Sequence, residues 1–202
     1  MEFSFSANRW LTPEEIDSKK EDLGSRNALG FHISGMWDKI LDIEKCHLQE
    51  DPSNEIRNTI KHFAEKKGLS FYNPRTQEGL LRTMMIRISS TGEIMLVIQF
   101  FEDDRKKREL LLDYLIEKFP SLTSLQYIIN SKGNDSIYDQ EIVLYHGVDH
   151  IFEEMEGLRF KINAKSFYQT NSKQAYELYK LTREFAQLSG EELVYDLYTG
   201  TG

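Results

Sequence analysis

The stretch Glu192-Leu-Val-Tyr-Asp-Leu-Tyr-Thr-Gly-Thr-Gly202 is the most informative local signal in the sequence. Its apolar residues predict a β-strand over residues 192–197 that places an acid, Asp196, at the carboxyl end. Gly200 and Gly202 then let the backbone pass close to a ligand, because glycine has no Cβ. Open α/β sheets bind nucleotides at this edge. A glycine pair alone also occurs in many ordinary strand-to-helix turns.

A helix is predicted immediately before that strand, over residues 171–188. Helix, strand and glycine loop together are typical of the beginning of an α/β unit, which we assign to residues 158–202. The helix that should follow the glycine loop is missing, so we expect the chain to be a fragment of a longer protein.

The first 157 residues instead alternate hairpins with helices, a pattern typical of an α+β domain with a mixed or antiparallel sheet. One helix is predicted from Asp51-Pro52, an acid followed by proline, to a capping glycine at Gly68. Residues 8–27 are interpreted as a long loop. The remaining predicted elements are a helix over 105–119 and strands over 2–6, 28–34, 36–41, 80–88, 93–101, 124–129, 141–145, 151–154 and 159–162.

Composition limits the classes of function. The 202 residues carry a net charge of −8, which argues against a simple basic nucleic-acid clamp but allows a local basic face. No run approaches the roughly 18 apolar residues of a membrane span, and the first residues do not look like an export signal. A single cysteine excludes an internal disulfide and predicts a cytoplasmic protein. No obligate protein partner is evident from the sequence.

Three segments in family order resemble the S-adenosylmethionine-dependent RNA uracil-5-methyltransferases, which make 5-methyluridine in ribosomal or transfer RNA. Asp196-x-x-x-Gly-x-Gly is also the first motif of class I methyltransferases. The segments are Met1-Glu-Phe-Ser-Phe-Ser6, Ala164-Lys-Ser-Phe-Tyr-Gln-Thr-Asn171, and Asp196-Leu-Tyr-Thr-Gly-Thr-Gly202. The resemblance covers nearly the whole chain and is more specific than any one motif.

This resemblance implies a defined chemistry. In the family, a cysteine thiolate adds to C6 of a uracil that has left its stack, C5 takes the methyl group of S-adenosylmethionine, and a base removes the C5 proton. The resemblance places the nucleophile and the base beyond Gly202. The chain by itself is therefore expected to be inactive, and Cys46 is not the nucleophile.

The resemblance also assigns cofactor-binding residues. Gln169 comes first, because its amide can both donate and accept; without the family it would be read as a solvated residue at a helix entry. Tyr198 packs beside the cofactor, although an aromatic residue at a strand end is otherwise usually core. The remaining members of this set are Asp196, Gly200 and Gly202.

Contacts with RNA are predicted at Phe167, Asn171, Arg82 and Lys165, and Arg87 is a further possible phosphate contact. Stacking on a base would suit the ring of Phe167, or that of its neighbour Tyr168. Each has an ordinary alternative. An aromatic ring here is more often core, Asn171 is equally well an N-cap, and a strand arginine usually faces solvent.

Cys46 has two readings. A lone cysteine is most often a small buried apolar residue. Family members with a 4Fe-4S cluster use three upstream cysteines and a fourth at this place, and such clusters take four thiolates. The resemblance therefore implies Cys46 as a cluster ligand in the parent protein, while this chain cannot hold the cluster alone.

Two other functions remain possible on the sequence. Residues 1–160 would suffice for an RNA-binding module without catalysis, although such a module needs no glycine loop. A class I methyltransferase acting on a protein or a small molecule would have the loop but not the Phe-Tyr-Gln-Thr-Asn signature of residues 167–171.

Overall fold

The computed structural model describes residues 1–18 and 24–197. Its centre is a seven-stranded sheet in the order β3-β2-β1-β4-β5-β6-β7. Neighbouring strands are antiparallel except β5 and β6, which are parallel. The strands are β1 (Glu2–Ser6), β2 (Ala28–Ile33), β3 (Met36–Asp42), β4 (Leu81–Ile88), β5 (Ile94–Phe100), β6 (Ser124–Ile129) and β7 (Val143–Gly147). The predicted α+β fold with a mixed sheet is confirmed.

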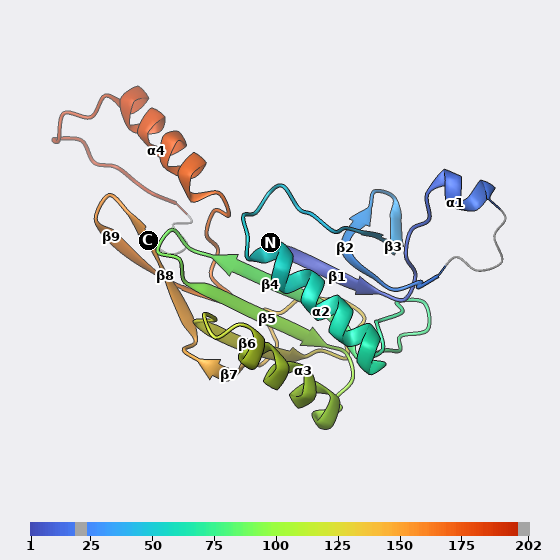
Figure 1. Cartoon of the computed structure of the whole chain (residues 1–202). Coiled ribbons are helices and arrows are strands. Elements are labelled where there is room, and N and C mark those ends of the chain that lie inside the picture. Colours follow the sequence, from blue (N-terminus) through green and yellow to red (C-terminus); the bar gives the residue numbers. More distant parts are fainter. Residues whose placement is uncertain (19–23, 198–202) are drawn as a thin grey trace.

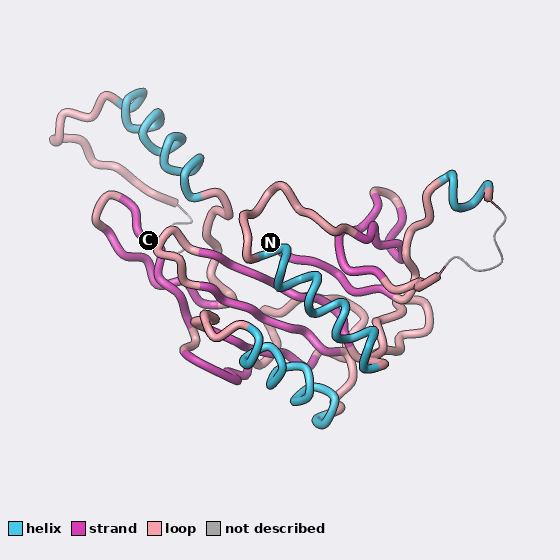
Figure 2. The backbone as a smooth tube through the Cα atoms, in the orientation of Figure 1, coloured by secondary structure: helices cyan, strands magenta, loops and turns pink. Residues whose placement is uncertain are grey.

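Two long helices, α2 (Ser53–Lys67) and α3 (Arg105–Lys118), cover one face of this sheet (Figures 1 and 2). α3 crosses from β5 to the parallel strand β6, as parallel neighbours require. The two helices bury an apolar stripe against the sheet. The buried helix residues include Ile56, Ile60 and Phe63 of α2 and Leu111, Leu112 and Leu115 of α3.

The N-terminal end of α2 differs by one residue from the prediction. Pro52 is the N-cap and not the first helical residue, and Asp51 accepts a hydrogen bond from the Asn54 amide at 3.2 Å. The carboxylate therefore still satisfies an amide of the first turn. Gly68 ends the helix in the left-handed region with φ of 65°, as predicted.

The segment predicted as a loop over residues 8–27 contains a short helix, α1 (Pro13–Asp17). Thr12 and Glu15 form a capping box, in which each side chain accepts from the other residue's backbone amide. The prediction of a long loop was wrong, because this capping box stabilises a helical turn within the polar segment.

The sheet face opposite α2 and α3 is built from alternate strand residues. On β1, Phe3 and Phe5 enter the helix-side core, whereas Glu2, Ser4 and Ser6 line cavities on the other face. We call this second side the open face. Part of it forms a smaller apolar cluster of Met85, Met95, Val97 and Ile128 with Ile151, Ile162 and Ala164.

That smaller cluster lies against a two-stranded hairpin, β8 (His150–Met155) and β9 (Leu158–Asn163), confirming the predicted hairpin. The expected domain boundary after residue 157 falls in the turn of this hairpin and stays a prediction. After the hairpin the chain runs through residues 164–171 into helix α4 (Ser172–Ala186), the predicted final helix.

The strand predicted over residues 192–197 is wrong for the described structure, where these residues form no strand. Figure 2 draws this part of the chain as loop. Leu193, Val194, Tyr195 and Leu197 are between 61% and 79% exposed. A strand needs a neighbour to satisfy its backbone groups, and no described strand pairs with this segment. Apolar pattern alone therefore did not produce the strand.

Candidate functional site

Residues 164–171 are held against the open face by Arg87 of β4. The Arg87 guanidinium donates to the Ser166 carbonyl at 2.8 Å and to the Ala164 carbonyl at 3.5 Å. Burial lowers the pKa of Arg87, yet an arginine remains charged at neutral pH. Within the described residues it forms no salt bridge with a carboxylate. This cation thus attaches residues 164–171, which we call the signature segment, to the sheet.

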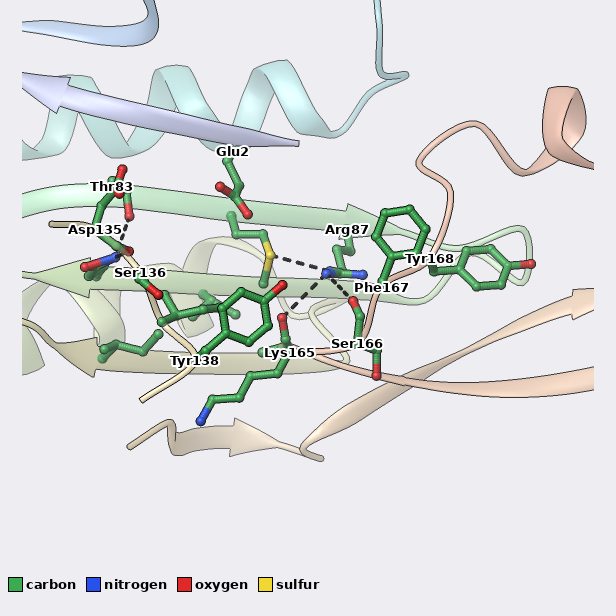
Figure 3. Close-up of a pocket in the computed structure, with 16 residues that line it drawn as sticks. Glu2, Thr83, Arg87, Asp135, Ser136, Tyr138, Lys165, Ser166, Phe167 and Tyr168 are labelled. Carbon is green, nitrogen blue, oxygen red and sulfur yellow. Dashed lines mark hydrogen bonds between the residues drawn. The ribbon is translucent and has the colours of Figure 1, made fainter. Parts of the chain in front are cut away.

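A cavity of about 270 Å³ lies between this segment, the open face and the loop after β6. Figure 3 shows Glu2, Arg87, Tyr138 and Phe167 arranged around it. As whole residues, Phe167 and Tyr138 are 69% and 73% exposed. We call this space the signature cavity. It combines a cation, two accessible aromatic rings and strand hydrogen-bonding groups, which suits a planar polar ligand.

Gln169 lines a second, smaller cavity of about 40 Å³, next to Arg87, Glu153 and Tyr168. Gln169 is exposed, and its side chain makes no hydrogen bond with the described residues. The hydroxyl of Tyr168 is buried and likewise has no hydrogen-bond partner among them. Two polar groups of the signature therefore have unused hydrogen-bonding capacity at one place.

Glu153 of β8 links the start of α4 to the turn after β4. The residue is only 3% exposed, and its carboxylate accepts hydrogen bonds from the Ser90 amide at 2.9 Å and from the Ser172 hydroxyl at 2.8 Å. A buried carboxylate is stable only when it is hydrogen-bonded in this way. Glu153 thus fixes the direction in which the chain leaves the signature segment.

The structure gives Asn171 the helix-capping role that the sequence left open. Its side-chain oxygen accepts from the Gln174 amide at 3.0 Å, which defines it as the N-cap of α4. Lys165 is one of the residues that line the signature cavity, and its ammonium donates to the Gln140 carbonyl at 2.8 Å. The RNA contacts predicted for both residues remain predictions.

Arg82 is 4% exposed and belongs to the interior more than to the surface. It donates to the carbonyls of Asn130 and Lys132, and its guanidinium lies 4.9 Å from the centre of the Tyr72 ring. These contacts hold the loop after β6 in place. Contact of Arg82 with RNA stays an untested prediction.

Only the beginning of the predicted cofactor loop, up to residue 197, lies among the described residues. Tyr198, Gly200 and Gly202 lie outside the described residues. Asp196 is exposed in a segment without secondary structure. Of the five predicted cofactor-binding residues, Gln169 therefore has a described position beside a cavity.

Cys46 is 5% exposed and packs in the helix-side core. Its amide donates to Asn54 at 2.6 Å, and Arg57 donates to the same Asn54 oxygen at 3.1 Å. Within the described residues, no three His, Cys, Asp or Glu side chains are grouped to bind a metal. A cluster needs four thiolates, so the described residues do not fit one by themselves. The cluster role of Cys46 in a parent protein stays a prediction.

Sequence reasoning did not identify Glu153, Tyr138 or Gln99 as residues of the site. Gln99 lines the signature cavity and donates to Thr83 at 3.1 Å. A glutamine within the apolar run of residues 94–100 was a usable signal, because a buried polar residue requires a partner. Nothing local marked Tyr138, which reaches the cavity through the fold of its loop.

Several known proteins with similar sequences are described as RNA methyltransferases. The chain is 57% identical over its full length to an RNA methyltransferase of Porphyromonas gingivalis and 55% identical to one of Bacteroides thetaiotaomicron. It spans 44% and 45% of those two proteins, less than half of their length. No family model matches the chain.

A known structure resembles the fold as well. The tRNA (uracil-54, C5)-methyltransferase of Pyrococcus abyssi, determined with S-adenosyl-L-homocysteine, is 30% identical with a TM-score of 0.63. The match covers 78% of this chain and 38% of that one. Over its whole length the chain is therefore similar to part of proteins that are described as RNA methyltransferases. The resemblance inferred from its motifs is thereby confirmed. Among the helices that the structure describes in this chain, none is long and apolar enough to cross a membrane.

Proposed function

We propose that the protein containing this chain transfers a methyl group from S-adenosylmethionine to C5 of a uridine in ribosomal or transfer RNA. The observation that carries the proposal is the structural likeness, at 30% identity, to a methyltransferase named for uracil C5 of tRNA. The sequence relatives described as RNA methyltransferases support the same substrate class.

The described residues fit a supporting role in that reaction. The Gln169 amide has no partner among them and lies beside a cavity, so it can bind a polar part of S-adenosylmethionine. That molecule supplies the methyl group when bound. Arg87 and Glu153 keep the signature segment and α4 in fixed positions, and Phe167 and Gln169 line two cavities that share Arg87 and Tyr168.

The nucleophile of this reaction belongs to the proposed whole protein and not to this chain. Its one cysteine, Cys46, is almost completely buried and hydrogen-bonded through its backbone within the core. A thiol in such surroundings is inert toward an RNA base.

The test uses the full-length protein with methyl-labelled S-adenosylmethionine and unmodified transcripts of tRNA and ribosomal RNA. We expect label in 5-methyluridine after digestion to nucleosides, together with release of tritium from RNA carrying [5-³H]uridine. Release of tritium is specific for substitution at C5. The choice between tRNA and ribosomal RNA follows from which transcript is labelled.

Other results would favour other functions. Methylation of a protein or a small molecule, without RNA, would replace the proposal with the class I alternative. Tight RNA binding without transfer would favour a binding module. The 202-residue polypeptide serves as the matched control, and formation of 5-methyluridine by it alone would contradict our placement of the nucleophile.

A further inference from the structure

A third cavity lies on the open face, on the side of the sheet near β2 and β3. It measures about 340 Å³ and shares the lining residues Thr83 and Asp135 with the signature cavity. We call the two together the open-face groove. The third cavity is lined by hydroxyl, imidazole, indole and guanidinium groups, those of Ser4, Ser6, His32, Trp37 and Arg82. A polar groove thus crosses the sheet on the side that the long helices leave uncovered.

Trp37 is the most conspicuous side chain of this groove. It is 63% exposed, although tryptophan is usually largely buried. The Arg75 guanidinium lies 5.8 Å from the centre of a Trp37 ring, and Arg75 is in turn paired with the buried carboxylate of Asp38. Arg75 therefore lies beside the indole and leaves much of Trp37 exposed. The exposed part of the indole can accept another planar group.

The signature cavity, at the other end of the groove, also has exposed aromatic residues. Phe167 and Tyr138 line it together with Arg87. Between these aromatic positions the strands provide hydroxyl and amide groups, including Ser4, Thr83 and Gln99. Successive aromatic rings separated by hydrogen-bonding groups are how sheets bind unpaired nucleic acid. A duplex does not fit this pattern, because its bases are stacked inside.

We propose that the open-face groove binds a single-stranded RNA segment, with one base stacked on Trp37 and the strand continuing toward Phe167. The inference rests on the proposed function, and it adds where the RNA next to the target lies. Asp38 and Asp135 also line the groove, and the charge of Asp38 is balanced by its salt bridge with Arg75. Stacking, more than phosphate attraction, therefore provides the affinity at Trp37.

The experiment measures binding of a fluorescently labelled, uridine-containing single-stranded RNA to the full-length protein. Trp37→Ala should weaken binding about 5- to 150-fold, the range expected for loss of one base–aromatic stack. Trp37→Phe should restore most of the affinity, because it keeps a ring. Leu48→Ala is the matched control, since Leu48 is 78% exposed and lies outside the groove. Far-ultraviolet circular dichroism of each variant verifies folding.

Methyl transfer by the wild-type protein is measured in the same preparation. Wild-type formation of 5-methyluridine together with unchanged RNA affinity in Trp37→Ala would overturn the groove and leave the proposed function intact. Loss of affinity in Trp37→Ala with no uridine methylation by the wild type would support the groove and overturn the proposed function. A Trp37-dependent preference for duplex over single-stranded RNA would also overturn the groove.

Discussion

The two faces of the central sheet differ in what covers them. Beneath α2 and α3, side chains such as Ile86 and Leu96 are fully buried in a continuous apolar core. On the open face, the hairpin β8–β9 packs against a smaller apolar cluster, and the remainder is polar and hollowed. Burial of apolar area is the main source of stability, whereas accessible polar groups and rings provide binding. We infer that this domain separates stability from recognition by the face of one sheet.

The largest expected effect tests that separation on a single strand. Ile86 faces the helices and is 0% exposed, while Thr83 on the same strand lines both large cavities. Ile86→Ala should lower the free energy of unfolding by about 2–5 kcal/mol, because it leaves a cavity in the core. Thr83→Ala should cost only about 0.5–1.5 kcal/mol, since it removes one hydrogen bond with Gln99. Urea denaturation measures both, and equal losses would contradict the division of roles.

The second prediction concerns binding on the open side. In the full-length protein, Gln169→Ala should weaken S-adenosylmethionine binding by about 1–3 kcal/mol, the usual cost of leaving buried polar partners unpaired. Gln174→Ala is a matched control, because it removes an exposed amide one turn further along. Titration calorimetry measures both affinities. An unchanged affinity for Gln169→Ala would move Gln169 to a contact with RNA or to a structural role.

A smaller effect is expected at the N-terminus of α4. Asn171→Ala should destabilise this helix by about 1 kcal/mol, because the Gln174 amide loses its capping partner. Asn171→Asp keeps an oxygen acceptor and should be close to neutral. Hydrogen exchange of residues 172–176 measures the change locally. An equal change in both variants would indicate that Asn171 has a role other than capping.

Much of the helix face could be predicted from the sequence, because its signals are local. Alternation of Phe3 and Phe5 with Glu2 and Ser4 predicts which side of β1 is buried. The stretch from Ile56 to Ala64 has the helical period, and Ile56, Ile60, Phe63 and Ala64, which share one face, are all buried. Local patterns also failed where they lacked context. The apolar run 192–197 forms no strand, because no described neighbour pairs with it.

The candidate site depends on long-range contacts and was correspondingly harder to predict. The Phe-Tyr-Gln signature was identifiable because it is contiguous. The hydrogen bond from Arg87 to Ser166 joins residues 79 positions apart in the sequence. The hydrogen bond from Ser90 to Glu153 joins residues 63 positions apart. Sequence periodicity carries no information about which distant strand a loop will contact. Arg87 could be noticed as a cation, but its hydrogen bonds to two carbonyls of the signature segment could not be foreseen.

The smallest predicted effects compare two tyrosines, one on each side of the sheet. The pKa of Tyr145 and that of Tyr168 are both raised to about 12, in each case mainly by burial. The second cause differs. Tyr145 donates to Asp113 of α3 at 2.6 Å, whereas Tyr168 has no hydrogen-bond partner among the described residues and lies near the Glu153 charge. At neutral pH, Tyr145→Phe should cost about 0.5–1.5 kcal/mol and Tyr168→Phe less than about 0.5 kcal/mol.

At alkaline pH the two variants should behave alike. A tyrosine with a folded-state pKa above its unfolded value of about 10 binds its proton more tightly in the folded protein. Its contribution to stability is complete below pH 10 and is lost as the pH rises from 10 to about 12. Each Phe substitution removes one such group, so each variant should lose less stability than the wild type between pH 9 and 11, measured by urea denaturation. A Tyr168→Phe variant with the wild-type alkaline loss would show that the Tyr168 hydroxyl is solvated, and would remove it from the interior of the open face.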